Sequence, residues 1–161
     1  MRWLRFAFLV LLMTILQASF VAALDIRPHL LLITLVFFAV YCDLTDAIIA
    51  SFAIGLTADL IGSAVGAHMI SFGLFGTLMA YLNRVMAVRK MPYQAGAIFI
   101  MGFLSLGAAH LLAYLVKDQA VSPRLHWELL WTSGCSGVIG PFLFLPMAWW
   151  MRIKVDRFGR R

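Results

Sequence analysis

Long apolar stretches, separated by short polar breaks, follow one another along the chain. The apolar stretches cover about residues 4–24, 29–42, 47–61, 69–82, 94–116 and 127–151. A helix of ~20 apolar residues is long enough to cross the hydrocarbon core of a bilayer. The pattern therefore predicts an all-α integral membrane protein, in which residues 1–161 form a single domain of six transmembrane helices.

The second and third stretches are short for full crossings, and the polar break between them covers only residues 43–46. One straight helix over both stretches would reach ~50 Å, well beyond the ~30 Å of the hydrocarbon core. We therefore predict two helices joined by a tight turn, with Thr45 or Asp46 capping the third helix. Asp43 and Asp46 could instead hold a divalent metal, but no second acidic pair follows them, so the turn is the better interpretation.

The composition excludes a soluble globular protein. Hydrophobic residues make up 63% of the chain and charged residues 12%, against ~45–50% and ~25% in soluble domains. The net charge of +6 could suggest a nucleic-acid partner, but the basic residues lie at the ends of the apolar stretches and form no continuous face. The two cysteines have no C-x-x-C spacing and no ligand residues beside them, so we expect no metal and no cofactor.

The basic residues predict which side of the membrane each loop occupies. Lys and Arg accumulate in short cytoplasmic loops. Six crossings with the N-terminus inside place ten basic residues on the cytoplasmic side and three on the outer side, so both ends are predicted to be cytoplasmic. We expect the basic tail to meet anionic lipid headgroups. The predicted cytoplasmic basic residues include Arg84, Arg89, Lys90, Arg152, Lys154 and Arg157.

Asp59 lies inside the third apolar stretch, where a carboxylate costs at least ~2.5 kcal/mol to insert. It could belong to an ion or substrate site, or it could make a structural hydrogen bond at the end of its helix. The structural interpretation is favoured, because Gly62 begins a glycine-containing connection nearby. The histidines show no ligand spacing, and the sequence has no visible catalytic triad or phosphate-binding loop, so we expect no enzymatic activity.

Small residues recur at helical spacing in the first and last stretches. Ala18 and Ala22 are four residues apart, and Gly134, Gly137 and Gly140 repeat every three residues. Such positions let membrane helices approach closely. They predict either packing within the chain, which we favour, or docking of a partner membrane helix.

Several short motifs in the first half of the chain resemble a known family. They are Arg27-Pro28 before the second stretch, the G-L-x-x-D-L segment from Gly55 through Asp59 to Gly62, the Gly66-Ala67-His68 connection, and Gly76 with Tyr81 before Arg84. This set is similar to the rod shape-determining MreD family. Thr57 and Ala58 depart from the aliphatic residues that are usual there, and the acidic turn at residues 43–46 departs from the basic or Gly-rich turn of many members.

The resemblance implies a non-enzymatic scaffold subunit in the bacterial cytoplasmic membrane, which supports cell shape and peptidoglycan synthesis. The implied partners are MreC, through its membrane helix and periplasmic domain, the RodA glycosyltransferase, the elongation penicillin-binding protein and the MreB filament. The resemblance also implies a six-helix fold similar to that of the substrate-binding subunits of energy-coupling-factor vitamin transporters.

Two other functions stay open. A solute-binding subunit of an energy-coupling-factor transporter would suit the size, the helix number and the alanine pair on the first helix. Such a subunit should show aromatic and polar residues converging on a vitamin, and Asn83, Asp118 and Trp127 are too scattered along the sequence for that. A small intramembrane enzyme would instead depend on the three aspartates named above.

Overall fold

In the computed structural model, every regular element of the described residues is a helix. The structure describes residues 3–21, 29–61, 66–86, 91–117 and 125–151. The helices are α1 (Trp3–Leu16), its π-helical continuation η1 (Gln17–Val21), α2 (Leu30–Tyr41), α3 (Leu44–Ile61), α4 (Ala67–Met86), α5 (Met91–Lys117) and α6 (Leu125–Met151). The six α-helices match the helix number that the apolar pattern predicts.

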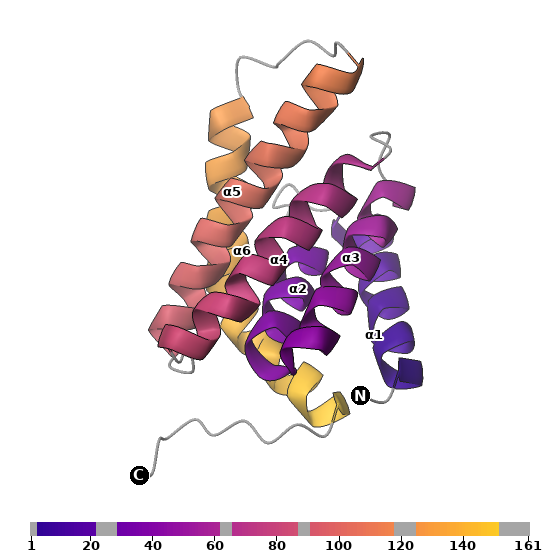
Figure 1. Cartoon of the computed structure of the whole chain (residues 1–161), viewed down its shortest axis with the longest axis vertical. Coiled ribbons are helices and arrows are strands. Elements are labelled where there is room, and N and C mark those ends of the chain that lie inside the picture. Colours follow the sequence, from indigo (N-terminus) through magenta and orange to yellow (C-terminus); the bar gives the residue numbers. More distant parts are fainter. Residues whose placement is uncertain (1–2, 22–28, 62–65, 87–90, 118–124, 152–161) are drawn as a thin grey trace.

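Successive α-helices run in opposite directions and form one bundle (Figure 1). α1 begins and α6 ends at the lower end of the bundle in this view, whereas α3 ends and α4 begins at the upper end. By length and composition, α3 and long windows of α5 and α6 could each cross a membrane. α5 and α6 form a pair whose upper part extends beyond the other helices (Figure 1).

α2 is the central helix of the bundle. Each of its residues from Leu31 to Val40 is buried, and it contacts all five other α-helices. A helix that is apolar on every face has no side to show to water, so it is covered by its neighbours. With 12 residues, α2 is only ~18 Å long. The bundle is therefore built around a helix that is shorter than the hydrocarbon core.

Aromatic rings hold α2 against the first and last helices. The Phe38 ring lies edge-on to Phe6 of α1, with ring centroids 5.0 Å apart. The Phe37 ring meets Phe144 of α6 in the same way at 5.5 Å. Edge-to-face pairs of this kind stabilise a core by ~0.5–1.5 kcal/mol beyond their buried area. The N-terminal and C-terminal helices are thus packed against the same segment.

Several helix boundaries differ from the prediction: α4 extends to Met86 and not only to residue 82, and α5 begins at Met91 and not at residue 94. α3 begins at Leu44, three residues earlier than expected, because the Asp43 carbonyl already accepts a helical hydrogen bond from the Ala47 amide at 2.8 Å. Asp46 therefore lies within the first turn of α3, where a negative charge suits the helix dipole, and does not precede it as a cap. The first helix changes at Gln17 from α-helical to π-helical geometry, which the uniformly apolar stretch gave no sign of.

Candidate functional site

Asp59, near the end of α3, caps the N-terminus of α4. Its Oδ1 accepts a hydrogen bond from the His68 amide at 2.9 Å, and its Oδ2 accepts one from the Met69 amide at 2.9 Å. The His68 Nδ1 atom lies 3.1 Å from the same Oδ1, so the tautomer with its hydrogen on Nδ1 donates a third bond. The first amides of a helix have no partner within the helix. Asp59 thus caps α4 from another helix. Its carboxylate is buried, and the hydrogen-bond donors of His68 and Met69 stabilise its charge.

Glycines allow α3 and α4 to approach closely enough for this cap. A Cβ atom at Gly55 would lie 2.6 Å from the Met69 Cα and 2.8 Å from the His68 oxygen, both of which are backbone atoms. Gly66, just before α4, has a φ of 85°, a conformation that residues with a side chain rarely adopt. The contact between the end of α3 and the start of α4 therefore brings together four motif residues, Gly55, Asp59, Gly66 and His68.

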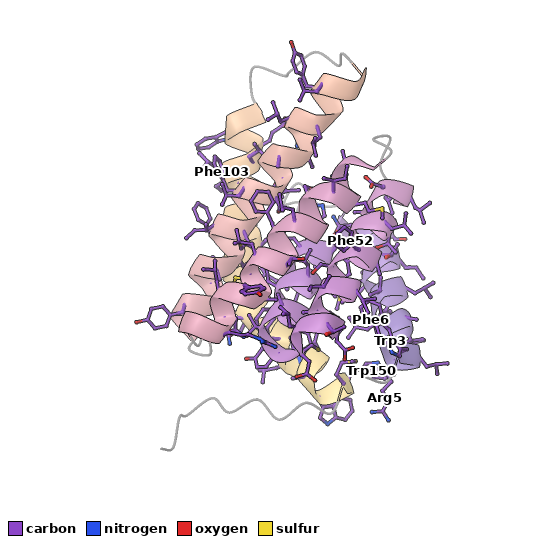
Figure 2. The ribbon with its side chains drawn as sticks, viewed as in Figure 1. Trp3, Arg5, Phe6, Phe52, Phe103 and Trp150 are labelled. Atoms are coloured by element: carbon purple, nitrogen blue, oxygen red, sulfur yellow. The ribbon has the colours of Figure 1, made fainter. Side chains whose placement is uncertain are left out.

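The same contact continues along the α3–α4 interface. A Cβ atom at Gly76 would lie 2.6 Å from the Ser51 Cβ, and Phe52 packs over Gly73 (Figure 2). The Ser51 hydroxyl donates to the Ala47 carbonyl of its own helix at 2.7 Å, so it needs no partner across the interface. The family-motif glycine at position 76 has the role of a close-packing position between two helices.

Phe72 connects the Asp59 cap to the start of the central helix. The buried Phe72 ring lies edge-on to the His68 ring at 5.7 Å and to the His29 ring at 5.6 Å. His29 is the N-cap residue of α2, and its Nδ1 atom accepts from the Leu32 amide at 3.3 Å. The start of α4 and the start of α2 are therefore held together through one aromatic side chain.

Two further side chains accept hydrogen bonds from backbone amides at the start of α2. Gln17 of η1 accepts from the Leu30 amide at 2.6 Å, and its Oε1 lies 3.4 Å from the Leu31 nitrogen. Ser136 of α6 accepts from the His29 amide at 2.8 Å. Because α2 is too short to bring its ends to both polar surfaces of a bilayer, its free amides must find partners inside the protein. The first and last helices of the chain supply these partners.

Side chains from α4 and α5 meet the other end of α2. Asn83 donates from Nδ2 to the Val40 carbonyl at 2.8 Å, and Gln94 donates from Nε2 to the Tyr41 hydroxyl at 2.7 Å. The carbonyls of the last helical turn have no partner within the helix, so the Asn83 bond satisfies one of them. Polar side chains of the bundle thus form hydrogen bonds at the ends of its helices.

The glycines predicted for α6 fall into two groups. A Cβ atom at Gly137 would lie 3.1 Å from the Ala95 oxygen of α5, and Gly140 packs directly against Ile98 of α5. These two positions make α5 and α6 pack closely. A Cβ atom at Gly134 would meet no atom within 4 Å, so packing with the described helices does not require glycine there.

The remaining predicted residues are distributed as follows. Ala18 lies in η1 and is exposed, and Tyr81 and Arg84 are exposed on the last turns of α4. The described residues contain no group of three or more His, Cys, Asp or Glu side chains arranged to hold a metal ion. Outside the described residues lie Ala22, Arg27, Pro28, Gly62, Arg89, Lys90, Arg152, Lys154 and Arg157.

The sequence reasoning missed Gln17, Ser136, Asn83 and Gln94 as partners of α2. One signal was available, since an amide side chain inside a long apolar stretch is costly in lipid and marks a position with an internal partner. Gln17 fits that description. The identity of the partner could not be read, because the Ser136–His29 bond joins residues 107 positions apart.

The chain, including the motif residues of the α3–α4 contact, was compared with known proteins. The model of a family described as rod shape-determining protein MreD matches residues 1–150. The chain belongs to the MreD family. The MreD protein of Haemophilus influenzae, named rod shape-determining protein MreD, is 25% identical over 123 residues, which are 76% of this chain and 74% of that protein. No significant match to a solved structure was found.

Membership of the MreD family confirms the resemblance predicted from the motif residues. It makes the chain a rod shape-determining membrane protein, in keeping with its several apolar helices of membrane-spanning length. The likeness to the subunits of energy-coupling-factor transporters stays a prediction. The α3–α4 hairpin of this chain brings together the motif positions Gly55, Asp59, Gly66, His68 and Gly76.

Proposed function

We propose that this protein is a non-enzymatic scaffold subunit of the bacterial cell-elongation complex. In this proposal the chain crosses the cytoplasmic membrane six times, with both ends in the cytoplasm. The start of α1 and the end of α6 lie at the same end of the bundle, which supports an even number of crossings. The excess of basic residues on that side supports its cytoplasmic location.

One observation carries the scaffold function. The polar side chains Asp59, Gln17, Ser136 and Asn83 form hydrogen bonds with the ends of α2 and α4, and so serve the fold. A catalytic group must keep a reactive atom available to a substrate. A bundle whose buried polar groups fix the helices relative to one another is suited to presenting rigid helix faces to other membrane proteins.

The proposed partners are those of the rod complex. MreC would contact the bundle through its membrane helix and its periplasmic domain, and RodA and the elongation penicillin-binding protein would belong to the same assembly. The exposed Arg84, with the basic residues that follow α4 and α6 in the sequence, would face the MreB filament or anionic lipids. Neutralising these residues in the inserted protein should reduce MreB recruitment, and unchanged recruitment would exclude that contact.

Depletion in the native bacterium tests the function directly. Cells that lose the protein should become round, and expression of the unmodified gene should restore rods. The G55A variant, which disturbs the α3–α4 contact, should restore rods poorly, whereas G134A should restore them. Rods that persist after depletion would contradict the proposed function, because a family assignment alone does not establish what this chain does in its own cell.

A vitamin-binding subunit of an energy-coupling-factor transporter is the alternative, and it is tested by titrating the purified protein with vitamins. A pocket of that kind needs polar groups that remain available to a ligand. His29 and Gln17, at the upper end of α2, already accept hydrogen bonds from its amides. Binding of any vitamin at sub-micromolar strength would nevertheless replace the scaffold proposal.

A further inference from the structure

A groove of about 180 Å³ lies between α1 and α6. Its walls come from α1 and from the last residues of α6. α1 begins and α6 ends at the same end of the bundle (Figure 1). The Phe8 ring stacks on the Trp150 ring at 5.2 Å and joins the two walls at one end. The lining is entirely apolar or aromatic and includes Phe8, Leu12, Met13, Pro146, Met147 and Trp150.

The size of the groove restricts what can occupy it. A cavity of ~150 Å³ lined by apolar side chains stays dry and binds benzene. The groove is slightly larger than that, so it accepts a few carbons of a hydrocarbon chain. A helix of a partner protein is ~10–12 Å across with its side chains, and it would rest over such a groove without filling it. Hydrocarbon of lipid is the occupant whose size and chemistry fit.

A positive charge lies one helical turn before the groove. Arg5 precedes Phe8 by three residues and Leu9 by four, so the three residues share one face of α1. The rise from Arg5 to Phe8 is ~4.5 Å toward the bundle interior. Figure 2 shows Arg5 at the same end of the molecule as Trp3 and Trp150.

The surroundings of Arg5 mark the level of lipid headgroups. Trp3, Trp149 and Trp150 are exposed at this end, and indole rings favour the boundary between lipid and water. The sequence also carries Arg2 before α1, and five basic residues against one acidic residue after α6. A phosphate at this level would therefore lie near the Arg5 side chain while its acyl chain enters the groove.

We propose that the α1–α6 groove is a binding site for an anionic phospholipid. One acyl chain lies against Phe8, Leu12 and Pro146, and the phosphate lies at the level of Arg5. The lipid fills a hollow between the first and last helices, where protein side chains leave a gap. It thereby completes the packing of α1 against α6 without taking part in the contacts of α2.

Native mass spectrometry of the delipidated full chain tests the site. The probes are phosphatidylglycerol and phosphatidylcholine with identical acyl chains, added as an equimolar mixture. We expect the unmodified protein to retain phosphatidylglycerol with about fivefold preference, the ratio that follows from one basic residue near an anionic headgroup. R5Q should lower that ratio, whereas E128Q, which removes a charge from the first turn of α6 at the opposite end of the bundle, should leave it unchanged.

Substitutions that fill the groove test the acyl-chain contact independently of the Arg5 charge. L12W places an indole in the groove and should abolish retention of both lipids, whereas L11W changes a neighbouring exposed position outside the lining and should retain them. P146F fills the groove from α6 and gives a second variant if L12W does not fold. Equal retention by L12W or P146F and the unmodified protein would overturn the proposal, and so would equal retention of the two lipids by the unmodified protein.

Occupation of the groove by protein would be a different result. In a chain with both native cysteines replaced by alanine, L12C should remain monomeric on mild oxidation in native membranes, because lipid separates it from other chains. Formation of a disulfide-linked dimer would show that a second copy occupies the groove, and the lipid proposal would be wrong. These measurements do not depend on the rod function, so each proposal can fail without the other.

Discussion

The side-chain oxygen of Gln17 lies 2.6 Å from the backbone nitrogen of Leu30, so the first helix of the chain closes the first turn of the buried central helix. The bond matters because α2 is ~18 Å long, so in a bilayer its two ends cannot both reach the polar surfaces. A backbone amide in such a place costs free energy unless it has an acceptor. This contact leads to the first testable prediction.

The Q17L variant should be less stable than the unmodified protein. It removes the acceptor for the half-buried Leu30 amide, and a donor left unpaired inside the protein costs ~1–3 kcal/mol. The free energy of unfolding in mixed micelles, measured by titration with sodium dodecyl sulfate, should fall by that amount. A18L, at the exposed next position, is the matched control and should change little. Equal stability of Q17L and A18L would contradict the role assigned to Gln17.

Variants of Asp59 distinguish a helix cap from an ion or substrate site. D59N keeps one acceptor oxygen for the amides at the start of α4, so we expect a loss of ~1 kcal/mol of unfolding free energy, and a larger loss for D59A. D59N should still support rod shape in the depleted strain. If D59N folds with unchanged stability but leaves cells round, the charge itself has a function that capping does not explain. D43N, in the exposed α2–α3 turn, is the control.

Replacement of two glycines by alanine should have opposite effects. G55A drives a methyl group against backbone atoms of Met69 and His68, which cannot rotate away, so α3 and α4 must separate. Overpacking of this kind costs ~1–3 kcal/mol. G134A meets open space and gains ~0.5–1 kcal/mol from the lower backbone freedom of alanine. When thermal unfolding is measured in one detergent, the Tm of G55A should therefore be lower than that of the unmodified protein. The Tm of G134A should be equal to it or higher.

Labelling of single cysteines tests the proposed sidedness. The labelled chain has Cys42 and Cys135 replaced by alanine. D43C is in the α2–α3 turn at the end of the bundle where α1 begins, and V121C is in the part of the sequence that connects α5 to α6. A membrane-impermeant maleimide added to spheroplasts should label V121C at once and D43C only after lysis. The reverse order would place both ends of the chain outside.

The helices could be predicted from the sequence because lipid imposes a simple rule. Every span must satisfy its own backbone, so apolar length alone indicates a helix, and all six apolar stretches contain one. The end of α1 could not be placed, because the change to π-helical geometry at Gln17 leaves no apolar-to-polar boundary. The start of α3 was missed for a related reason, since Asp43, Thr45 and Asp46 look like a turn although helix begins between them.

The site was partly visible in the sequence. Asp59 and the glycines at positions 55, 66 and 76 were singled out as motif residues, and a hydrogen bond at a helix end was the favoured interpretation of Asp59. The donors were not identified, because a cap from a neighbouring helix depends on how two helices cross. Phe72 was hidden for the same reason, since an aromatic ring in an apolar segment gives no sign that it lies between two histidines.

The bond between the His29 amide and Ser136 joins residues separated by 107 positions, so it imposes an order on biosynthesis. At ~5–20 residues per second, the ribosome needs ~5–20 s after making the central helix before its last partner exists. During that interval the His29 amide at the start of α2 lacks its acceptor, although Gln17 and His29 already cap the amides that follow it. A membrane protease or chaperone can recognise such an incompletely paired apolar segment. The half-life of the nascent chain in the membrane therefore depends on the arrival of its final helix, and chains truncated before Ser136 should be degraded rapidly.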